Sequence, residues 1–267
     1  SSLLLMPSWK IGDHLGVKLV TVSPNNYKYK LPSIQGLYIL FDAVKGTPLM
    51  LLDAQELTAR RTASSSALAS TFLSRRDSET LLMVGTGKLA PYLIEAHATV
   101  RRYKRILIWG RNRDKAQAVC DLLNPKMDVQ ITRVEDLEKG IKQADVVSCA
   151  TLSATPLILG TWLKPGQHID LVGAYKSDMR EADDDAIKKS SVFIDTFQGG
   201  LKESGDIVIP LRMGIIKPED IKADLFQLCS NEKPGRTSSN EITIFKSVGH
   251  ALEDLVAAKY YYNKFTN

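Results

Sequence analysis

Short apolar runs alternate with amphipathic stretches from Thr80 onward, and this alternation constrains the fold more than any other feature of the chain. Helical spacing of apolar residues is seen in 88–101, 114–123 and 135–141. Because parallel strands need long return connections, strands that alternate with helices predict a doubly wound parallel sheet, and hence an α/β fold. The expected strands are Leu81–Val84, Arg105–Trp109, Val129–Thr132, Asp145–Ala150, His168–Val172 and Val192–Ile194.

The two ends of the chain have a different pattern. Leu15–Val22 and Leu37–Phe41 are apolar runs separated by a polar loop, and turn residues follow at 45–48, which is typical of antiparallel hairpins. The spacing predicts an Ala/Ser-rich helix over 58–73 and a last helix over 247–265. If the last helix returns to the first lobe, that lobe is discontinuous. We therefore predict an α+β lobe formed by 1–75 together with 243–267, and a parallel-sheet domain over 76–242.

An apolar strand runs directly into a glycine-containing loop, Gly85-Thr86-Gly87-Lys88-Leu89-Ala90. In a G-x-G-x-x-A pattern the first glycine makes a tight turn and the second lets a pyrophosphate approach the backbone. The small third residue lets helix and strand touch. The helix that follows offers N–H groups and a partial positive charge to phosphates. Such a triplet alone can be only a turn, but its place at the start of the alternating region predicts a Rossmann-type domain that binds a dinucleotide through residues 85–90.

The end of the next expected strand indicates which dinucleotide binds. NAD-specific domains carry an acidic residue there, which binds the ribose 2′-hydroxyl. Here the run is Arg111-Asn112-Arg113, with no acidic residue before Asp114. A guanidinium matches a 2′-phosphate in charge and geometry, although arginines at a helix start can also be merely solvated. We predict NADPH as the cofactor, with NADH as the alternative, and contacts from residues 111–113 and from Thr151.

Composition and charge argue against several classes of protein. Hydrophobic residues make up 44% and charged residues 24%, as in globular rather than disordered chains. The net charge is +5, but the basic residues are not interleaved with aromatic residues as in nucleic-acid-binding proteins, so we expect no nucleic-acid partner. The longest uncharged stretch, 146–163, contains many polar residues, and 1–6 lacks the pattern of a signal peptide, so we expect no membrane association. Three cysteines and four histidines without ligand spacing predict no metal site and a cytoplasmic location.

Five segments resemble the ornithine cyclodeaminase/mu-crystallin family and occur in that family's order. They are Leu15-Gly16-Val17-Lys18, Arg61-Thr62-Ala63, Val84-Gly85-Thr86-Gly87, Met179-Arg180-Glu181 and Ile242-Thr243-Ile244-Phe245-Lys246-Ser247-Val248-Gly249. The resemblance implies a Rossmann domain inserted in a discontinuous substrate and dimerisation lobe, a homodimer, and chemistry at an imine whose α-carbon bears a carboxylate. Its members include ornithine cyclodeaminases, an archaeal type of alanine dehydrogenase, and ketimine reductases. By the same resemblance we expect a few dozen further family residues, among them a substrate-carboxylate arginine, ahead of Ser1.

The resemblance also implies roles for individual residues. Lys18 aligns with the family's catalytic lysine, which binds the substrate carboxylate or carries a proton, although a lysine in an apolar strand can also face solvent at a sheet edge. Arg61 aligns with the arginine of an R-T-A motif and would hold a carboxylate with its planar guanidinium, unless it is simply solvated. Ser33 aligns with a threonine that contacts substrate, but it also fits a turn after a proline. Val248 and Gly249 align with the segment that lies against the nicotinamide.

Tyr175 departs from the pattern of the cyclodeaminases. In these enzymes and in the related alanine dehydrogenases a catalytic aspartate occupies the corresponding place, whereas the mu-crystallin-like ketimine reductases lack it. Because a cyclic ketimine bound as its iminium accepts a hydride at C2 directly, a dedicated base is dispensable. We therefore predict an NAD(P)H-dependent reductase that converts Δ1-pyrroline-2-carboxylate and Δ1-piperideine-2-carboxylate to L-proline and L-pipecolate. The alternatives are an ornithine cyclodeaminase and a non-catalytic, NADPH-dependent binder of a small ligand, of the mu-crystallin type.

Overall fold

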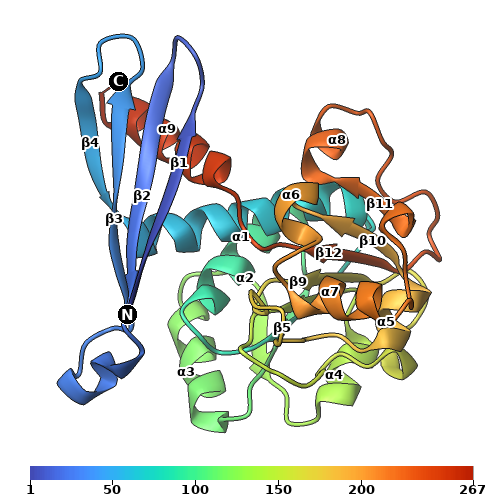
Figure 1. Ribbon diagram of the computed structural model, residues 1–267. Helices are drawn as coiled ribbons and strands as arrows, with labels where there is room; N and C mark the ends of the chain where they lie inside the picture. Colours follow the sequence, from blue (N-terminus) through green and yellow to red (C-terminus); the bar gives the residue numbers. More distant parts are fainter. Residues whose placement is uncertain (267) are drawn as a thin grey trace. The chain divides into compact units, whose positions relative to one another are not determined.

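The computed structural model describes residues 1–266, and the chain divides into two compact units (Figure 1). Both ends of the chain, 1–62 and 249 onward, form one unit, and residues 63–248 form the other. The boundaries lie at 62/63 and 248/249, whereas the sequence suggested 75/76 and 242/243. Asn267, the last residue of the predicted lobe, lies outside the described residues. Within residues 1–266, no helix is both long enough and apolar enough to cross a membrane.

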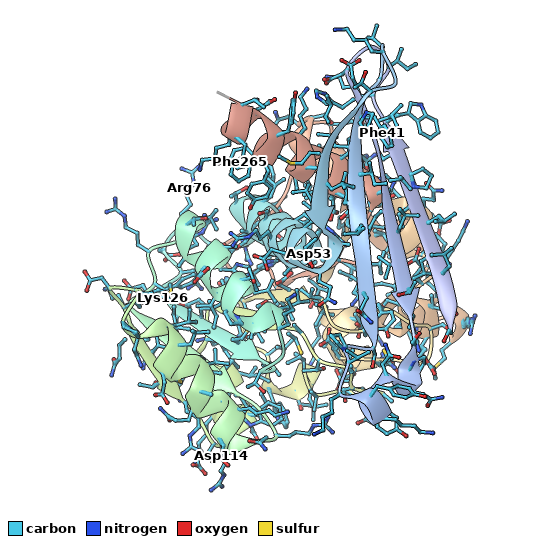
Figure 2. The ribbon with its side chains drawn as sticks, turned by 90° about the vertical axis from the view of Figure 1, so that its left-hand side faces the viewer. Phe41, Asp53, Arg76, Asp114, Lys126 and Phe265 are labelled. Atoms are coloured by element: carbon cyan, nitrogen blue, oxygen red, sulfur yellow. The ribbon has the colours of Figure 1, made fainter. Side chains whose placement is uncertain are left out.

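The unit built from the chain ends is a four-stranded antiparallel sheet with a helix packed on one face. Its strands pair in the order β1-β2-β3-β4, which confirms the predicted hairpins and adds the strands β1 and β4. On the covered face, Tyr38 and Leu40 are fully buried against Leu255 and Ala258 of the last helix. In Figure 2, Phe41 and Asp53 mark the two ends of the β3–β4 pair. The elements are β1 (Ser2–Trp9), β2 (His14–Val22), the 3₁₀ turn η1 (Pro24–Tyr29), β3 (Ile34–Asp42), β4 (Pro48–Asp53) and α9 (Ala251–Thr266). The helix α1 (Ala54–Leu73) begins in this unit, and its residues from 63 onward belong to the other.

The second unit holds an eight-stranded sheet in which all neighbouring strands are parallel, with the order β11-β10-β12-β9-β8-β5-β6-β7. The chain moves outward from β5 to β6 and β7 and then returns to β8 on the other side of β5. This reversal makes the β5–β8 boundary a topological switch point, where open α/β sheets bind ligands at the carboxyl ends of the strands. The predicted doubly wound fold is therefore confirmed. The strands are β5 (Thr80–Val84), β6 (Arg105–Trp109), β7 (Gln130–Arg133), β8 (Val146–Cys149), β9 (His168–Leu171), β10 (Ser191–Ile194), β11 (Ile221–Asp224) and β12 (Thr243–Lys246).

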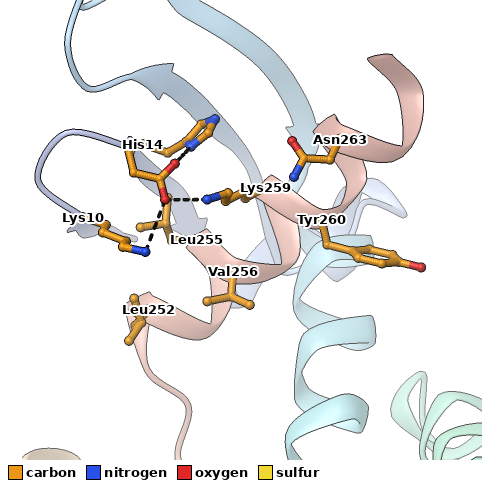
Figure 3. Close-up of a pocket in the computed structure, with 9 residues that line it drawn as sticks. Lys10, His14, Leu252, Leu255, Val256, Lys259, Tyr260 and Asn263 are labelled. Atoms are coloured by element: carbon orange, nitrogen blue, oxygen red, sulfur yellow. Dashed lines mark hydrogen bonds and ion pairs between the residues drawn. The ribbon is translucent and has the colours of Figure 1, made fainter. Parts of the chain in front are cut away.

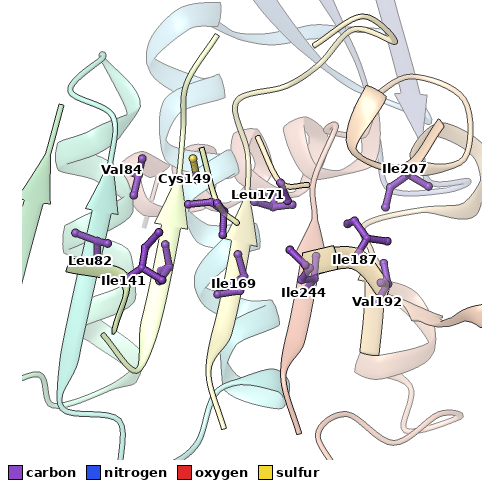
Figure 4. Close-up of a cluster of buried hydrophobic side chains, with 14 of the residues drawn as sticks. Leu82, Val84, Ile141, Cys149, Ile169, Leu171, Ile187, Val192, Ile207 and Ile244 are labelled. Atoms are coloured by element: carbon purple, nitrogen blue, oxygen red, sulfur yellow. The ribbon is translucent and has the colours of Figure 1, made fainter. Parts of the chain in front are cut away.

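Helices cover both faces of the parallel sheet, which explains why its central strands are apolar on both sides. Leu82 and Val84 point toward one face and Leu81 and Met83 toward the other, and all four are fully buried. Figure 4 shows the first of these faces, where strand side chains meet Ile141, Ile187 and Ile207 of the covering helices. Each such side chain contributes about 1.5–3 kcal/mol through burial. The helices of this unit are α2 (Leu89–Val100), α3 (Arg113–Leu123), α4 (Leu137–Gln143), α5 (Asp184–Lys189), α6 (Phe197–Gly200), α7 (Gly205–Arg212) and α8 (Leu225–Cys229), with 3₁₀ turns η2 (Gly160–Trp162) and η3 (Pro218–Asp220).

Candidate active site

The glycine loop joins β5 to α2 with a backbone that requires glycine. Gly85 has φ +113°, and a Cβ there would lie 2.5 Å from the carbonyl oxygen of Ala150. No atom lies within 4 Å of the position that a Cβ on Gly87 would take, so the backbone is open on that side. Ala90 is buried in the core at the first turn of α2. The loop thus has the open backbone and the helix start that a pyrophosphate requires.

Residues 86–89 form the rim of this loop. Thr86 is half-buried and packs against Gly110, where a Cβ would lie 2.6 Å from the Thr86 methyl carbon. This contact brings the end of β6 close to the loop. Lys88 is exposed at the position before α2, and Leu89 is half-buried as the first residue of the helix. The cluster of predicted contacts at 85–90 therefore lies at the carboxyl end of β5, beside the switch point.

Arg111, Asn112 and Arg113, which follow Gly110 just past the end of β6, are all exposed. Asn112 caps α3, because its side-chain oxygen accepts a hydrogen bond of 2.9 Å from the backbone N–H of Lys115. Arg113 begins α3, and its guanidinium pairs with Glu135 at 2.5 Å. Glu135 also pairs with Arg133, at 2.9 Å. Arg111 and Arg113 both lie just past the carboxyl end of β6, and the amide of Asn112 has a structural role.

The remaining predicted cofactor contacts lie on several segments. Thr151 follows β8 and is half-buried, and it donates from both its backbone N–H (2.7 Å) and its hydroxyl (2.9 Å) to Glu181. Val248 follows β12, and its N–H donates to Asp195 at 2.6 Å. Gly249 belongs to the other unit, where its φ is +90° and a Cβ would lie 2.6 Å from the Arg61 guanidinium.

Lys18 and Arg61 meet on one buried carboxylate. The Lys18 ammonium lies 2.7 Å from one oxygen of Asp254, and Arg61 Nε donates to the other oxygen at 3.0 Å. Arg61 also donates to Glu253 at 2.8 Å. The Lys18 side chain is 4% exposed, that of Arg61 7%, and that of Asp254 is fully buried. Neither cation is therefore the solvated residue that the sequence left as an alternative.

Burial and charge set the protonation of this cluster. Burial lowers the pKa of Lys18, and the nearby Arg61 lowers it further, against the opposing effect of Asp254. Burial also acts to lower the pKa of Arg61, but Asp254 and Glu253 outweigh it and raise that pKa. Arg61 is consequently a fixed cation, whereas Lys18 gives up its proton more readily than a solvated lysine does.

Two other residues of interest are not part of this cluster. Ser33 is exposed and lies just before β3, and its backbone oxygen accepts a hydrogen bond from the N–H of Ser23. Lys18 pairs across the sheet with Tyr38, which is five residues further along β3, or about 16 Å at ~3.3 Å per residue. The strand register therefore does not bring Ser33 to Lys18. Tyr175, in the segment after β9, is exposed and belongs to the other unit.

Asp254 and Glu253 were not predicted, although the sequence holds a signal for Asp254. The buried residues of α9 are Asp254, Leu255 and Ala258, so a carboxylate lies on the apolar stripe of an amphipathic helix. A charged group at such a position is costly unless it is paired, and it indicates a partner cation elsewhere in the chain. The pairing with Lys18 of β2 and Arg61 of α1 depends on the fold and could not be read from spacing.

Two of the isolated histidines have core roles. His97 Nε2 lies 3.2 Å from Asp170, and His168 Nδ1 lies 3.0 Å from the Thr243 hydroxyl, with all four residues fully buried. Burial lowers the pKa of His168 to about 3, so it is neutral at ordinary pH. Among the residues the structure describes, no group of three or more His, Cys, Asp or Glu is arranged to hold a metal ion.

A pocket of about 380 Å³ lies between the β1–β2 turn and α9 (Figure 3). Asp13 is its central polar group, with Lys259 and His14 as close partners and Lys10 at 3.6 Å. Lys259 and His14 lower the pKa of Asp13 to about 2. Neither Lys18 nor Arg61 lines this pocket, so the candidate catalytic cations lie outside it.

Similarity to known proteins shows the family to which the chain belongs. The sequence profile of the ornithine cyclodeaminase/mu-crystallin family matches residues 1–267. The chain belongs to this family. Within it, a Δ1-pyrroline-2-carboxylate reductase of Colwellia psychrerythraea is 40% identical over 256 residues, covering 95% of this chain and 81% of the relative.

Two solved structures of family members show the same fold. The Δ1-pyrroline-2-carboxylate reductase of Thermococcus litoralis, in complex with NADH and L-proline, has a TM-score of 0.93 at 35% identity and covers 98% of this chain and 81% of that one. An archaeal alanine dehydrogenase dimer with bound NAD has a TM-score of 0.91 at 28% identity, covering 98% of this chain and 80% of that one. These similarities confirm the predicted fold class.

Proposed function

We propose that this chain is an NAD(P)H-dependent reductase of cyclic ketimines, acting on Δ1-pyrroline-2-carboxylate and Δ1-piperideine-2-carboxylate to give L-proline and L-pipecolate. The observation that carries the proposal is the buried pair of cations, Lys18 and Arg61, held on Asp254. The relatives named Δ1-pyrroline-2-carboxylate reductase and the neighbour bound to NADH and L-proline support it.

The cluster has the charges that a zwitterionic substrate needs. Two cations, Lys18 and Arg61, face two carboxylates, Asp254 and Glu253, and a protonated cyclic ketimine likewise carries one carboxylate and one positive nitrogen. We assign the substrate carboxylate to the two cations, with Arg61 fixing its orientation through its planar fork. Lys18, with its lowered pKa, supplies a proton when the imine arrives unprotonated. Reduction of C=N to CH–NH then needs only a hydride, which a bound nicotinamide supplies.

Tyr175 argues against ornithine cyclodeamination. That reaction must activate water and release ammonia, and a carboxylate at this position would serve as its base. A tyrosine that is 45% exposed offers no carboxylate there. Direct imine reduction has no such requirement, and for this reason we prefer it.

NADPH is the cofactor that we propose, with NADH as the alternative. The residues present fit a dinucleotide, because Gly87 leaves the backbone open and Gly85 adopts a conformation that favours glycine. Arg111 and Arg113 would hold the 2′-phosphate, and the strand end carries no acidic residue to bind a 2′-hydroxyl. The three cysteines are free, which suits the reducing cytoplasm that we propose as the location.

Addition of either ketimine to the purified chain with NADPH is expected to produce a fall in absorbance of the reduced nucleotide and one equivalent of cyclic amino acid. NADPH should have the lower KM, and Arg111→Ala together with Arg113→Ala should raise the KM for NADPH by about 10-fold or more while leaving that for NADH nearly unchanged. L-Ornithine with NAD(P)+ serves as the comparison. Ammonia release from ornithine, without turnover of either imine, would identify a cyclodeaminase instead.

We also propose a homodimer formed through the uncovered face of the antiparallel sheet. Strand register places Leu3, Leu5 and Trp9 of β1 on this face with Leu37 of β3 and Leu51 of β4. Their exposed fractions are 51–66%, unusual for large apolar residues clustered on one sheet face. The archaeal neighbour described as a dimer supports a second copy as the occupant.

Leu5→Glu combined with Leu37→Glu is expected to yield monomers, because two charges would be buried against the partner copy. Sedimentation velocity gives the mass directly. Leu122→Glu, at a leucine of α3 that is 46% exposed, is the matched control and should remain dimeric. A wild-type chain that sediments as a monomer at micromolar concentration would refute the proposal.

A further inference from the structure

The segment Met179-Arg180-Glu181 places a fully buried carboxylate among three backbone N–H groups and the Thr151 hydroxyl. One oxygen of Glu181 accepts from the Thr151 N–H at 2.7 Å and from the Thr151 hydroxyl at 2.9 Å. The other accepts from the N–H groups of Gly173 at 2.7 Å and Ala174 at 3.3 Å. A single side chain thus ties the segment that follows β8 to the segment that follows β9.

Two further buried charges hold Glu181 in place. Lys246, at the end of β12, lies 3.2 Å from Asp206 and 4.0 Å from Glu181, and all three side chains are fully buried. Asp206 accepts from the backbone N–H of Glu181 itself at 2.7 Å. Burial raises the pKa of Glu181, and Lys246 opposes that rise. A buried group of two carboxylates and one ammonium adds little stability by itself, so its value lies in the geometry that it fixes.

Close packing around Thr151 links the segment after β9 to the glycine loop at residues 85–90. A Cβ on Gly173 would lie 2.0 Å from the carbonyl oxygen of Thr151, so these two backbones are in direct contact. On the other side, the Cβ position of Gly85 is 2.5 Å from the Ala150 oxygen and 3.2 Å from the Thr151 methyl carbon. The 150–151 segment is therefore enclosed between the glycine loop and the segment after β9, with Glu181 fixing its position.

We propose that Glu181 is a positioning residue of the nucleotide site, which holds residues 150–151 and 173–174 as the wall of the nicotinamide half. These residues lie at the carboxyl ends of β8 and β9, on one side of the switch point. The adenosine would bind on the other side, at the end of β6. Lys246 and Asp206 act through Glu181. The inference rests on the proposed nucleotide site alone and does not depend on which imine is reduced.

Glu181→Gln tests this role because it keeps the shape of the side chain and replaces one acceptor oxygen by an NH₂ group that faces N–H donors. We expect the Kd of NADPH and of NADH to rise about 10- to 100-fold. The adenosine fragments, adenosine 2′,5′-bisphosphate and AMP, should bind as they do to the wild type. Isothermal titration of each ligand measures the four values without any turnover, so a chain that reduces neither imine still reports on Glu181.

Asp170→Asn is the matched control. Asp170, on β9, is also fully buried, and it accepts from the hydroxyl of Ser148 on β8 at 2.7 Å. We expect loss of its carboxylate to lower Tm without changing the ratio of the NADPH and fragment Kd values. If Glu181→Gln weakens the binding of nucleotides and of adenosine fragments equally, or weakens the binding of neither, Glu181 is a structural residue only. If the wild type binds neither NADPH nor NADH, the proposed nucleotide site itself fails.

Discussion

Alanine at Arg61 or at Lys18 is expected to lower kcat/KM for ketimine reduction by about 100-fold or more, because each removes a cation from the substrate carboxylate in a site shielded from water. The Arg61 guanidinium is held in place by Asp254 through Nε and by Glu253 through Nη1, so its loss affects orientation as well as charge. Initial rates of NADPH oxidation over a range of imine concentrations give kcat and KM for each variant.

Three controls separate catalysis from folding in these variants. Arg61→Lys keeps the charge and loses the fork, and it should fall between wild type and alanine. Ser33→Ala should retain nearly full activity, because Ser33 precedes β3 and is five residues from Tyr38, the residue opposite Lys18. Nucleotide Kd and Tm are measured alongside, since removal of Arg61 leaves Asp254 with Lys18 as its remaining cation. A variant with wild-type kcat/KM removes that residue from the proposed site.

Gly85→Ala is expected to abolish nucleotide binding and to lower Tm. A φ of +113° is unfavourable for alanine, and the added Cβ would meet the carbonyl oxygen of Ala150 at 2.5 Å. Strained backbone of this kind costs about 1–3 kcal/mol before the steric clash is counted. Titration with NADPH and thermal unfolding monitored by circular dichroism measure the two effects.

Gly87→Ala should separate the effect on nucleotide binding from the effect on stability. Its Cβ would meet no atom within 4 Å, so the Tm of the nucleotide-free protein should match the wild type. The same methyl group would occupy the space through which the pyrophosphate approaches, so we expect NADPH affinity to fall about 10-fold or more. Unchanged NADPH affinity in Gly87→Ala would show that the phosphates do not lie against this loop.

The fold was predictable where the spacing of apolar residues along the chain is enough to identify each strand and helix. From Thr80 to Leu171, strands with buried faces alternate with helices of regular apolar spacing, and the expected and observed bounds agree closely. β11 (Ile221–Asp224) and β12 (Thr243–Lys246) were not predicted: Lys222 and Asp224 interrupt the first, and only two apolar residues stand between Thr243 and Lys246 in the second. β1 was also missed, because the leucines at 3–5 lie on an edge strand and do not alternate with polar residues.

Of the candidate site, only the two cations could be predicted from the sequence. Lys18 and Arg61 were identified from their motifs, whereas the carboxylates that hold them, Asp254 and Glu253, come from a helix more than 190 positions away in the sequence. Glu181 was recognised as part of a motif, but nothing in the spacing shows that it accepts from Thr151 and Gly173. Long-range pairing of buried charges is set by the tertiary structure, and a single sequence does not encode it locally.

The position of β12 has a consequence for the order in which the chain can fold. It hydrogen-bonds between β9 and β10, although both are made earlier. During synthesis, therefore, β9 and β10 emerge with unpaired edges and cannot close the sheet until residues 243–246 arrive. Until then Glu181 and Asp206 lack the ammonium group of Lys246. The second unit should accordingly reach its native state in a late step, with sheet closure and neutralisation of buried charge occurring together.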